Sequence, residues 1–253
     1  MRGLAGKRVI VTGGASGIGR EICKRFGEEG STVGIFDLNE VGAGETAGIV
    51  ALAGGMATAH KVDITDRASV DAAVAAFAED GPIDILINNA GWDKPIAFLD
   101  TDTDFWKKIV DLNLYGPLHM HHAVLPYMVE RKSGRVVNIA SDAARVGSSG
   151  EAVYAACKGG IVSFTKTVAR ELARANIQLN AVCPGPTDTP LFEEFSQGEA
   201  GAKVAEGLKR AIPMRRLGEP EDYPGIVAFL ASDDAGFITG QVISVSGGLT
   251  MHG

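Results

Sequence analysis

Two residues with complementary chemistry, Tyr154 and Lys158, stand four positions apart in the second half of the chain. If this segment is helical, the spacing places both side chains on one face, with their Cβ atoms about 5–6 Å apart. A free tyrosine has a pKa of about 10 and is a poor base at neutral pH, but a neighbouring ammonium group stabilises the phenolate and lowers that pKa. The pair therefore predicts a proton-transfer site where a secondary alcohol becomes a ketone, or the reverse.

A serine supports this interpretation. Ser141 ends a predicted strand thirteen residues before Tyr154, so its hydroxyl can donate a hydrogen bond to a substrate oxygen on which negative charge develops. The Tyr-x-x-x-Lys spacing alone is common, and in most proteins it is an exposed amphipathic pair. The serine and a nucleotide-type turn upstream are independent requirements of the chemistry, and both are met.

That turn is the glycine-rich segment Thr12–Gly19, between a predicted strand and a predicted helix. Gly13 allows a sharp bend, Gly17 lets the backbone approach a pyrophosphate, and Gly19 lets the helix pack closely on the sheet. The helix N-terminus supplies N–H donors and a positive dipole end for phosphate. The spacing G-x-x-x-G-x-G differs from the usual dinucleotide fingerprint, so a tight structural turn is the alternative.

Asp37 ends the second predicted strand, eighteen residues after Gly19. A carboxylate at this place accepts hydrogen bonds from ribose hydroxyls and repels a 2′-phosphate. Neither Ser16 nor Leu38 is basic, so the sequence favours NAD over NADP; a solvated turn is the alternative for Asp37. Asp63 ends the third predicted strand, where it could accept a hydrogen bond from the adenine amine or belong to the cap of the next helix.

Short β-branched runs alternate with longer helical patterns along the whole chain. The predicted strands are Arg8–Thr12, Thr32–Phe36, Thr58–Val62, Ile83–Asn88, Arg135–Ala140, Gln178–Val182 and Val242–Val245. The predicted helices are Ile18–Glu29, Glu40–Ala53, Arg67–Glu79, Thr103–Arg131, Ala152–Ala175, Gly201–Ala211 and Pro220–Ala231. Almost wholly apolar strands in this alternation predict the α/β class, with a doubly wound (Rossmann) parallel sheet of about seven strands buried on both faces by helices.

We expect one domain over residues 1–253. The stretch Pro184–Gly218 mixes proline, glycine, serine and charge beyond the carboxyl end of a strand, where ligands bind in open α/β sheets. It predicts a mobile substrate lid at about 186–217, in which Val204–Leu208 forms an apolar face.

The composition excludes several classes of partner. A net charge of −7 argues against nucleic acid and, more weakly, against anionic membrane surfaces. No apolar run reaches the length of about 18 residues that a membrane span needs, and the N-terminus has no apolar stretch of a signal peptide. The cysteines Cys23, Cys157 and Cys183 have no metal or disulfide spacing, which suits a reducing compartment. These features predict a cytoplasmic protein.

With these motifs in place, the chain resembles the short-chain dehydrogenases/reductases over essentially its whole length. The matching segments are Thr12-Gly13-x-x-x-Gly17-x-Gly19, Asn88-Asn89-Ala90-Gly91, Asn113 in Leu112–Gly116, Ser141, Tyr154-x-x-x-Lys158 and Pro184-Gly185-x-Thr187. The resemblance implies a catalytic set of Asn113, Ser141, Tyr154 and Lys158. It also implies an NAD site made of Gly13, Ser16, Gly17, Ile18, Gly19, Asp37, Leu38, Asp63, Ile64, Asn89, Ala90, Gly91, Tyr154, Lys158, Pro184, Gly185, Thr187 and Thr189.

The resemblance further implies particular roles. Asn113 would hold a water that links Lys158 to solvent, and Lys158 would also bind the nicotinamide ribose. Asn89, Ala90 and Gly91 would line the adenosine side, while Pro184, Gly185 and Thr187 would border the nicotinamide amide. A homotetramer is implied as well, with Thr103–Arg131 and Ala152–Ala175 packing against symmetry mates.

Three further segments resemble dehydrogenases of cyclic 2-hydroxyacyl-CoA thioesters in alicyclic acid degradation: Ala90–Asp93, Leu118–Pro126 and Ala140–Glu151, together with the tail Ser246–Met251. The expected reaction is therefore oxidation of such a thioester to its keto form. A 3-oxoacyl-thioester reductase and a sugar or polyol dehydrogenase are alternative enzymes. A catalytically silent NAD-binding regulator is the alternative from another class.

Several residues have two interpretations each. Trp92 could form a wall for a ring-shaped substrate or pack in the core or an interface. Arg145 could pair with a thioester oxygen or CoA phosphate, or form an intersubunit ion pair. Arg215, like Lys203, Lys209 and Arg210, could contact a CoA phosphate or be a solvated charge. His119 and His122 could share a helix face, but no carboxylate or cysteine stands at matching spacing, so we expect no metal.

Overall fold

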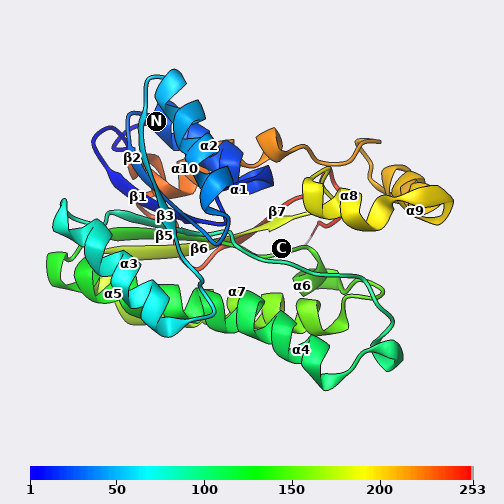
Figure 1. The fold of residues 1–253 in the computed structure, drawn as a ribbon. Helices are drawn as coiled ribbons and strands as arrows, with labels where there is room; N and C mark the ends of the chain where they lie inside the picture. The colour runs from blue at the N-terminus through cyan, green and yellow to red at the C-terminus, as the bar shows by residue number, and fades with distance from the viewer. Residues whose placement is uncertain (252–253) are drawn as a thin grey trace.

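The structure, a computed structural model, describes residues 1–251, with all side chains except those of residues 195, 199 and 200. Seven parallel strands form one sheet in the order β3-β2-β1-β4-β5-β6-β7 (Figure 1). The strands are β1 (Arg8–Thr12), β2 (Thr32–Asp37), β3 (Met56–Lys61), β4 (Ile85–Asn88), β5 (Gly134–Ile139), β6 (Ile177–Pro184) and β7 (Val242–Val245). The predicted seven-stranded doubly wound sheet is confirmed.

Helices cover both faces of the sheet, as predicted. On one face lie α1 (Gly17–Glu28), α2 (Glu40–Leu52) and α10 (Pro224–Ala231), and on the other lie α3 (Arg67–Glu79), α5 (Gly116–Arg131) and α7 (Ala152–Leu172) (Figure 1). Two apolar cores result. Ile22, Phe26 and Val227 pack on the first face, and Val74, Met120 and Val124 pack on the second.

The expectation that every strand is buried on both faces is wrong at one edge of the sheet. Most side chains of β3 are exposed, because β3 is the outermost strand and pairs only with β2. Those of β7, at the other edge, are half-buried. The central strands β1, β4, β5 and β6 match the expectation, since their side chains are almost all buried.

The prediction of one continuous helix over Thr103–Arg131 is also wrong, because the helix is interrupted near its centre. Helix α4 (Thr103–Val110) passes into a π-helical turn at Asp111–Tyr115, and α5 follows from Gly116. Pro117 lacks an N–H and therefore cannot donate to the carbonyl group of Asn113 as a regular helix requires. Such π turns are frequent at functional sites, and this one contains Asn113.

The stretch with the expected lid contains two helices, of which only the second was predicted. They are α8 (Pro190–Ser196) and α9 (Gly198–Ala211), and they extend beyond the carboxyl end of the sheet (yellow in Figure 1). Phe192, Ile212 and Leu217 form a small separate core beneath them. A four-residue helix that the sequence did not predict, α6 (Ala143–Val146), follows β5.

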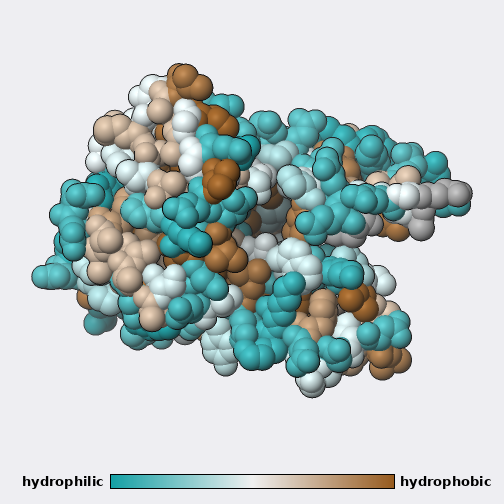
Figure 2. Space-filling view, in the orientation of Figure 1, coloured by the Kyte–Doolittle hydropathy of each residue, from teal (hydrophilic) through white to brown (hydrophobic). Residues whose placement is uncertain are grey.

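The topology determines where a ligand can bind. Strand β1 lies between β2 and β4, so the chain reverses its direction of winding between these neighbours. Ligands of open α/β sheets bind at the carboxyl ends of the strands beside such a reversal. In the space-filling view the surface is hollowed between the segment that carries α8 and α9 and the part formed by α4 and α6 (Figure 2). Among residues 1–251, no helix combines the length and apolarity needed to cross a membrane.

Candidate functional site

The glycine turn after β1 is compact enough to accept only glycine at the predicted positions. A Cβ on Gly19 would lie 2.0 Å from the carbonyl oxygen of Gly13, and a Cβ on Gly13 would lie 2.7 Å from the Cα of Ala90. Gly13 and Gly17 both have positive φ angles, of 67° and 53°. The cap of α1 at Ser16 uses no side-chain hydrogen bond, so the Ser16 hydroxyl does not occupy the first N–H groups of the helix. This turn fits a pyrophosphate.

Asp37 lies at the end of β2 beside this turn. Its carboxylate accepts hydrogen bonds from the backbone N–H groups of Ala15, at 2.9 Å, and Asn39, at 2.8 Å. Each carboxylate oxygen keeps a lone pair for a further donor such as a ribose hydroxyl. Leu38 next to it is 63 % exposed and offers no charge. The residues present therefore fit an unphosphorylated ribose.

Asp63 does not cap the following helix. Asp66 caps α3 by accepting from the N–H of Ala68, whereas Asp63 accepts from the N–H and hydroxyl of Thr65 in a turn. Asp63 is therefore not the N-cap residue itself, but it lies in the N-cap region, where its N–H donates to Ser69 Oγ of α3 at 3.1 Å. Ile64 is buried against Gly116, where a Cβ would lie 2.6 Å from the Ile64 side chain.

Asn89 connects the loop after β4 to the glycine turn. Its amide nitrogen donates to the carbonyl oxygens of Thr12, at 3.1 Å, and Gly13, at 3.0 Å. A Cβ on Gly91 would lie 2.8 Å from Asn113 Oδ1 and 3.2 Å from Lys158 Nζ. The structure thus brings Gly91, Asn113 and Lys158 together.

Asn113 is fully buried and held by the π turn. Its amide donates to the carbonyl oxygens of Trp92, at 2.8 Å, and Ile109, at 3.0 Å, and its Oδ1 accepts from the N–H of Trp92 at 3.3 Å. Lys158 is buried and donates from Nζ to the carbonyl oxygen of Ile139 at 3.0 Å. Burial lowers the pKa of Lys158 to about 8.

Tyr154 and Ser141 meet at the carboxyl end of β5. Burial raises the pKa of the Tyr154 phenol above its usual value, the Glu151 carboxylate acts in the same direction, and a hydrogen bond with the Ser141 side chain acts against them. Lys158 Nζ lies 5.6 Å from the centroid of the Tyr154 ring. In the chain by itself the pKa of Tyr154 is therefore raised and not lowered as the sequence suggested, because burial outweighs the hydrogen bond with Ser141.

The loop after β6 borders the glycine turn. A Cβ on Gly17 would lie 3.6 Å from the Thr189 side chain, and Thr189 caps α8 by accepting from the N–H of Phe192. The Thr187 hydroxyl is bonded to the Gly185 carbonyl oxygen at 2.8 Å and to the Tyr223 hydroxyl. These bonds fix the loop from Pro184 to Thr189 above the edge of the sheet where the other site residues lie.

The comparisons with known proteins agree with this geometry. Residues 13–250 match the family described as enoyl-(acyl carrier protein) reductase. The chain belongs to the short-chain dehydrogenases/reductases. It is 34 % identical over 249 residues to a 3-oxoacyl-(acyl-carrier-protein) reductase of Thermotoga maritima, with 98 % of this chain and 99 % of the relative covered. It is 37 % identical over 250 residues to the BbsD subunit of a hydroxy(phenyl)methylsuccinyl-CoA dehydrogenase of Thauera aromatica, with 98 % of each covered.

Solved structures of short-chain dehydrogenases/reductases superpose closely. A 3-ketoacyl-(acyl-carrier-protein) reductase of Brucella melitensis with NADH gives a TM-score of 0.90 at 35 % identity, covering 98 % of this chain and 100 % of the other. An actinorhodin polyketide ketoreductase with NADPH gives 0.92 at 35 % identity, covering 98 % and 99 %. The chain is thus a short-chain oxidoreductase of a family that binds nicotinamide cofactors, and these two related structures contain NADH and NADPH, respectively.

The three residues considered for substrate contact lie in different surroundings. Arg145 donates to the Val242 carbonyl oxygen at 3.2 Å and to Ser244 Oγ at 3.0 Å, so its guanidinium is engaged on β7. The Trp92 ring lies 3.7 Å from Lys108 Nζ. Arg215 is exposed, has a positive φ of 61°, and donates to the Arg210 carbonyl oxygen.

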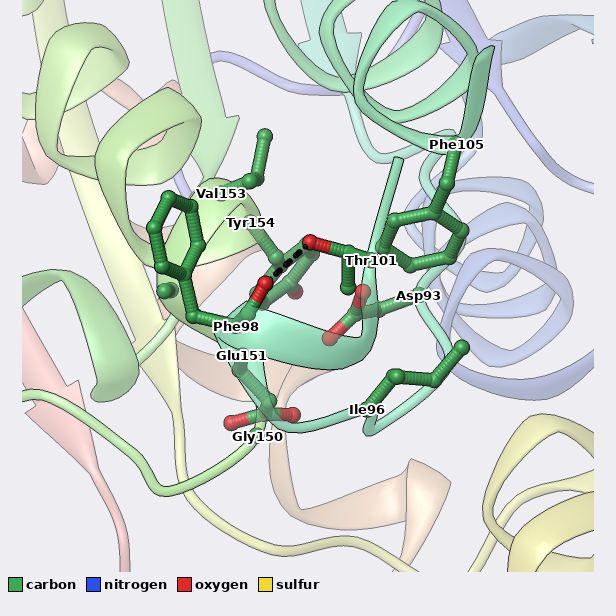
Figure 3. Close-up of a pocket in the computed structure, with 10 residues that line it drawn as sticks. Asp93, Ile96, Phe98, Thr101, Phe105, Gly150, Glu151, Val153 and Tyr154 are labelled. Atoms are coloured by element: carbon green, nitrogen blue, oxygen red, sulfur yellow. Dashed lines mark hydrogen bonds between the residues drawn. The ribbon is translucent and has the colours of Figure 1, made fainter. Parts of the chain in front are cut away.

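A pocket beside Tyr154 contains two carboxyl groups that the sequence interpretation did not single out, Asp93 and Glu151. The pocket is lined by Asp93, Ile96, Phe98, Thr101, Phe105, Gly150, Glu151, Ala152, Val153 and Tyr154 (Figure 3). Burial, together with the neighbouring Glu151 carboxyl group, raises the pKa of Asp93 to about 7, against the opposing effect of a hydrogen bond from the Lys94 backbone. No spacing in the sequence could have revealed the pair, because the fold alone brings the two residues together.

The raised pKa of Asp93 predicts that stability falls as the pH rises. The folded chain binds a proton at Asp93 up to about pH 7, whereas the unfolded chain releases it near 4, so the stabilisation is present at low pH and is lost through pH 7. From pH 6 to pH 8 this group should cost about 1.4 kcal/mol of unfolding free energy. The Asp93→Asn variant should lack this component.

Urea unfolding of both proteins at pH 6 and pH 8 measures the difference. All other titrating groups are common to the two proteins, so they cancel in the comparison. Equal pH dependence of the parent and the variant would contradict the prediction.

Proposed function

We propose that the chain is an NAD-dependent dehydrogenase that oxidises a secondary alcohol to a ketone, with Asn113, Ser141, Tyr154 and Lys158 as its catalytic set. One observation carries the proposal. Tyr154 meets Ser141 at the same edge of the sheet as the glycine turn, and Lys158 lies beside Asn113 and Gly91. NAD, when bound, would accept the hydride.

Residues of the chain itself would bind the substrate hydroxyl and accept its proton. The Ser141 hydroxyl would hold the substrate oxygen, and the Tyr154 phenolate oxygen would take its proton. Because burial disfavours the phenolate, Tyr154 depends on nearby positive charge, which Lys158 and the oxidised nicotinamide would supply together. Asn113, fixed in the π turn, would keep the Lys158 ammonium connected to solvent through a water.

NAD rather than NADP is supported by the Asp37 carboxylate and by the absence of a basic residue at Ser16 and Leu38. Replacement of Asp37 by serine would remove a like charge from the place of a 2′-phosphate. We expect the ratio of kcat/KM for NADP to that for NAD to rise by at least about tenfold.

The matched control is Asp71→Ser. Asp71 is exposed on α3, where it pairs with Arg67, so this variant should leave the ratio unchanged. A parent enzyme that already prefers NADP, or an Asp37→Ser variant with the parent ratio, would reject the role of Asp37.

For the substrate we propose a cyclic 2-hydroxyacyl-CoA, specifically 2-hydroxycyclohexanecarboxyl-CoA, which would be converted to its 2-keto thioester. The Thauera aromatica relative supports this, since its name describes a CoA thioester that carries a secondary alcohol. The alternative is a 3-oxoacyl-thioester reductase, supported by the Thermotoga maritima relative. A silent NAD-binding regulator receives less support, because Asn113, Ser141, Tyr154 and Lys158 are all present and close to one another. A polyol dehydrogenase would be favoured by activity with a free polyol and none with thioesters.

A side-by-side assay tests the proposed function. Cyclic and linear 3-hydroxyacyl-CoA thioesters, 3-oxoacyl thioesters and a free polyol would each be supplied with NAD(H) and with NADP(H). The expected result is the highest kcat/KM for the cyclic hydroxythioester with NAD. Preference for a linear oxothioester with NADPH would favour the reductase instead.

Three further expectations belong to this proposal. The segment 186–217 acts as a substrate lid, the protein assembles as a homotetramer in the cytoplasm, and Arg215 contacts a CoA phosphate. Arg215→Ala should raise the KM of the CoA substrate and leave the KM of a truncated thioester unchanged. Equal changes for the two substrates would reject the contact.

A further inference from the structure

The pocket beside Tyr154 contains a carboxyl pair contributed by two separate loops. Asp93 follows β4, and Glu151 precedes α7. A backbone hydrogen bond of 2.9 Å, from the N–H of Ile96 to the carbonyl oxygen of Gly150, joins the two loops. Glu151 lies within hydrogen-bonding reach of Asp93. The two carboxyl groups are therefore held together by the fold.

Asp93 is buried without a full set of partners. Its residue surface is 6 % exposed, and its Oδ2 is buried and makes no hydrogen bond. In Figure 3 its carboxyl group points into the pocket. Among residues 1–251, none of the ion pairs found involves Asp93 or Glu151. A buried polar atom left without a partner costs free energy, which a ligand atom placed there would recover.

The protonation state of Asp93 determines which ligand atom fits. Burial, with the Glu151 charge as a smaller contribution, raises the pKa of Asp93 to about 7, so about half of the Asp93 carboxyl groups carry a proton at pH 7 and most carry one at pH 6. A carboxyl group in this state donates one hydrogen bond, whereas a second anion beside it would be repelled.

The remaining walls of the pocket are apolar or already bonded. Ile96, Phe98, Phe105 and Val153 contribute apolar surface. The Thr101 hydroxyl donates to the Phe98 carbonyl oxygen at 2.7 Å and accepts from the Trp106 indole at 2.6 Å. Of the side chains that line this pocket, those left to bind a substrate through hydrogen bonds are therefore Tyr154 and the carboxyl pair. A substrate recognised by them would have an apolar body, one oxygen at Tyr154 and a second, neutral acceptor near Asp93.

We propose that Asp93, protonated beside the Glu151 carboxylate, donates a hydrogen bond to the thioester carbonyl oxygen, one carbon removed from the reacting carbinol, and that the pair excludes substrates in which this carbonyl belongs to a free carboxylate. The inference rests on the proposed oxidation of a 2-hydroxyacyl thioester and names the residues that would select it. In this proposal the carboxyl pair selects the substrate, and Tyr154 transfers the proton.

Three small probes separate this role from binding of CoA: methyl 2-hydroxycyclohexanecarboxylate, the corresponding free acid, and cyclohexanol, which has no carbonyl group. We expect the parent enzyme to prefer the ester to the acid by at least about 100-fold in kcat/KM. Asp93→Leu should lower kcat/KM for the ester by about 10- to 100-fold, mainly through KM, and leave that for cyclohexanol within about threefold. Asp93→Asn, which keeps a donor and removes the charge, should retain most of the ester activity and accept the free acid at least about tenfold better.

Glu151→Gln provides a second variant if Asp93→Leu does not fold, and it should also accept the free acid better. Asp71→Asn on α3 is the matched control and should change none of the ratios. Two results would overturn the inference. One is that Asp93→Leu lowers kcat/KM equally for the ester and for cyclohexanol. The other is that the ester-to-acid ratio of kcat/KM stays at the parent value in both Asp93→Asn and Glu151→Gln. An assay of the parent enzyme with 2-hydroxycyclohexanecarboxyl-CoA separates the two proposals. If the enzyme does not turn over this thioester but still prefers the ester to the free acid, the proposed substrate is rejected, and the role of the carboxyl pair in selection is retained.

Discussion

Tyr154→Phe is expected to lower kcat by about 1,000-fold with the coenzyme still bound. The substitution keeps the ring and removes only the hydroxyl that exchanges the proton, and positioned acid–base groups contribute about 10²- to 10⁴-fold to rate. Loss of the hydroxyl also frees Ser141 from its hydrogen bond with the phenol. Steady-state kinetics and titration of dinucleotide binding by fluorescence measure the two properties separately.

Tyr127→Phe is a matched control for this variant. Tyr127 lies on α5 and is 38 % exposed, so removal of its hydroxyl group should leave kcat unchanged. If Tyr154→Phe turns over near the parent rate, the phenol does not transfer the proton, and the silent or differently catalysed alternatives gain support.

Gly19→Ala is expected to have the second largest effect, on both coenzyme binding and stability. The added Cβ would lie 2.0 Å from the Gly13 carbonyl oxygen and 2.5 Å from Asn89 Nδ2, so the backbone of the turn has to move. Overpacking of this kind costs about 1–3 kcal/mol of stability. Displacement of phosphate-binding N–H groups by about 1 Å should weaken productive dinucleotide binding by about 100-fold.

Thermal unfolding and dinucleotide titration would measure these effects, with Gly44→Ala as the control. Gly44 is exposed in α2, and nothing lies within 4 Å of its would-be Cβ. Alanine there should stabilise the protein by about 0.4–1 kcal/mol, because it restricts the unfolded chain and favours the helix. Unaltered coenzyme affinity in Gly19→Ala would show that this turn does not hold the pyrophosphate.

What the sequence by itself determined was the alternation of strands and helices, and with it the parallel sheet. Strand and helix periods are local properties, and runs as apolar as β1, β4 and β6 can only be buried on both faces. The glycine turn and the Tyr154–Lys158 spacing could be recognised from the sequence for the same reason, since each depends on residues close together in the chain. Boundaries differ by a few residues, as at the start of α9, which lies at Gly198 where the sequence predicted Gly201.

The tertiary structure alone decided the features that depend on contacts between distant segments. The π turn at Asn113 follows from the proline at 117 together with the bonds that hold the Asn113 amide to Trp92. The guanidinium of Arg145 is engaged on β7, and Asp93 meets Glu151 only because their loops are joined at the edge of the sheet. The pKa of Tyr154 depends on burial by these same loops, and burial is a property of packing that no local pattern encodes.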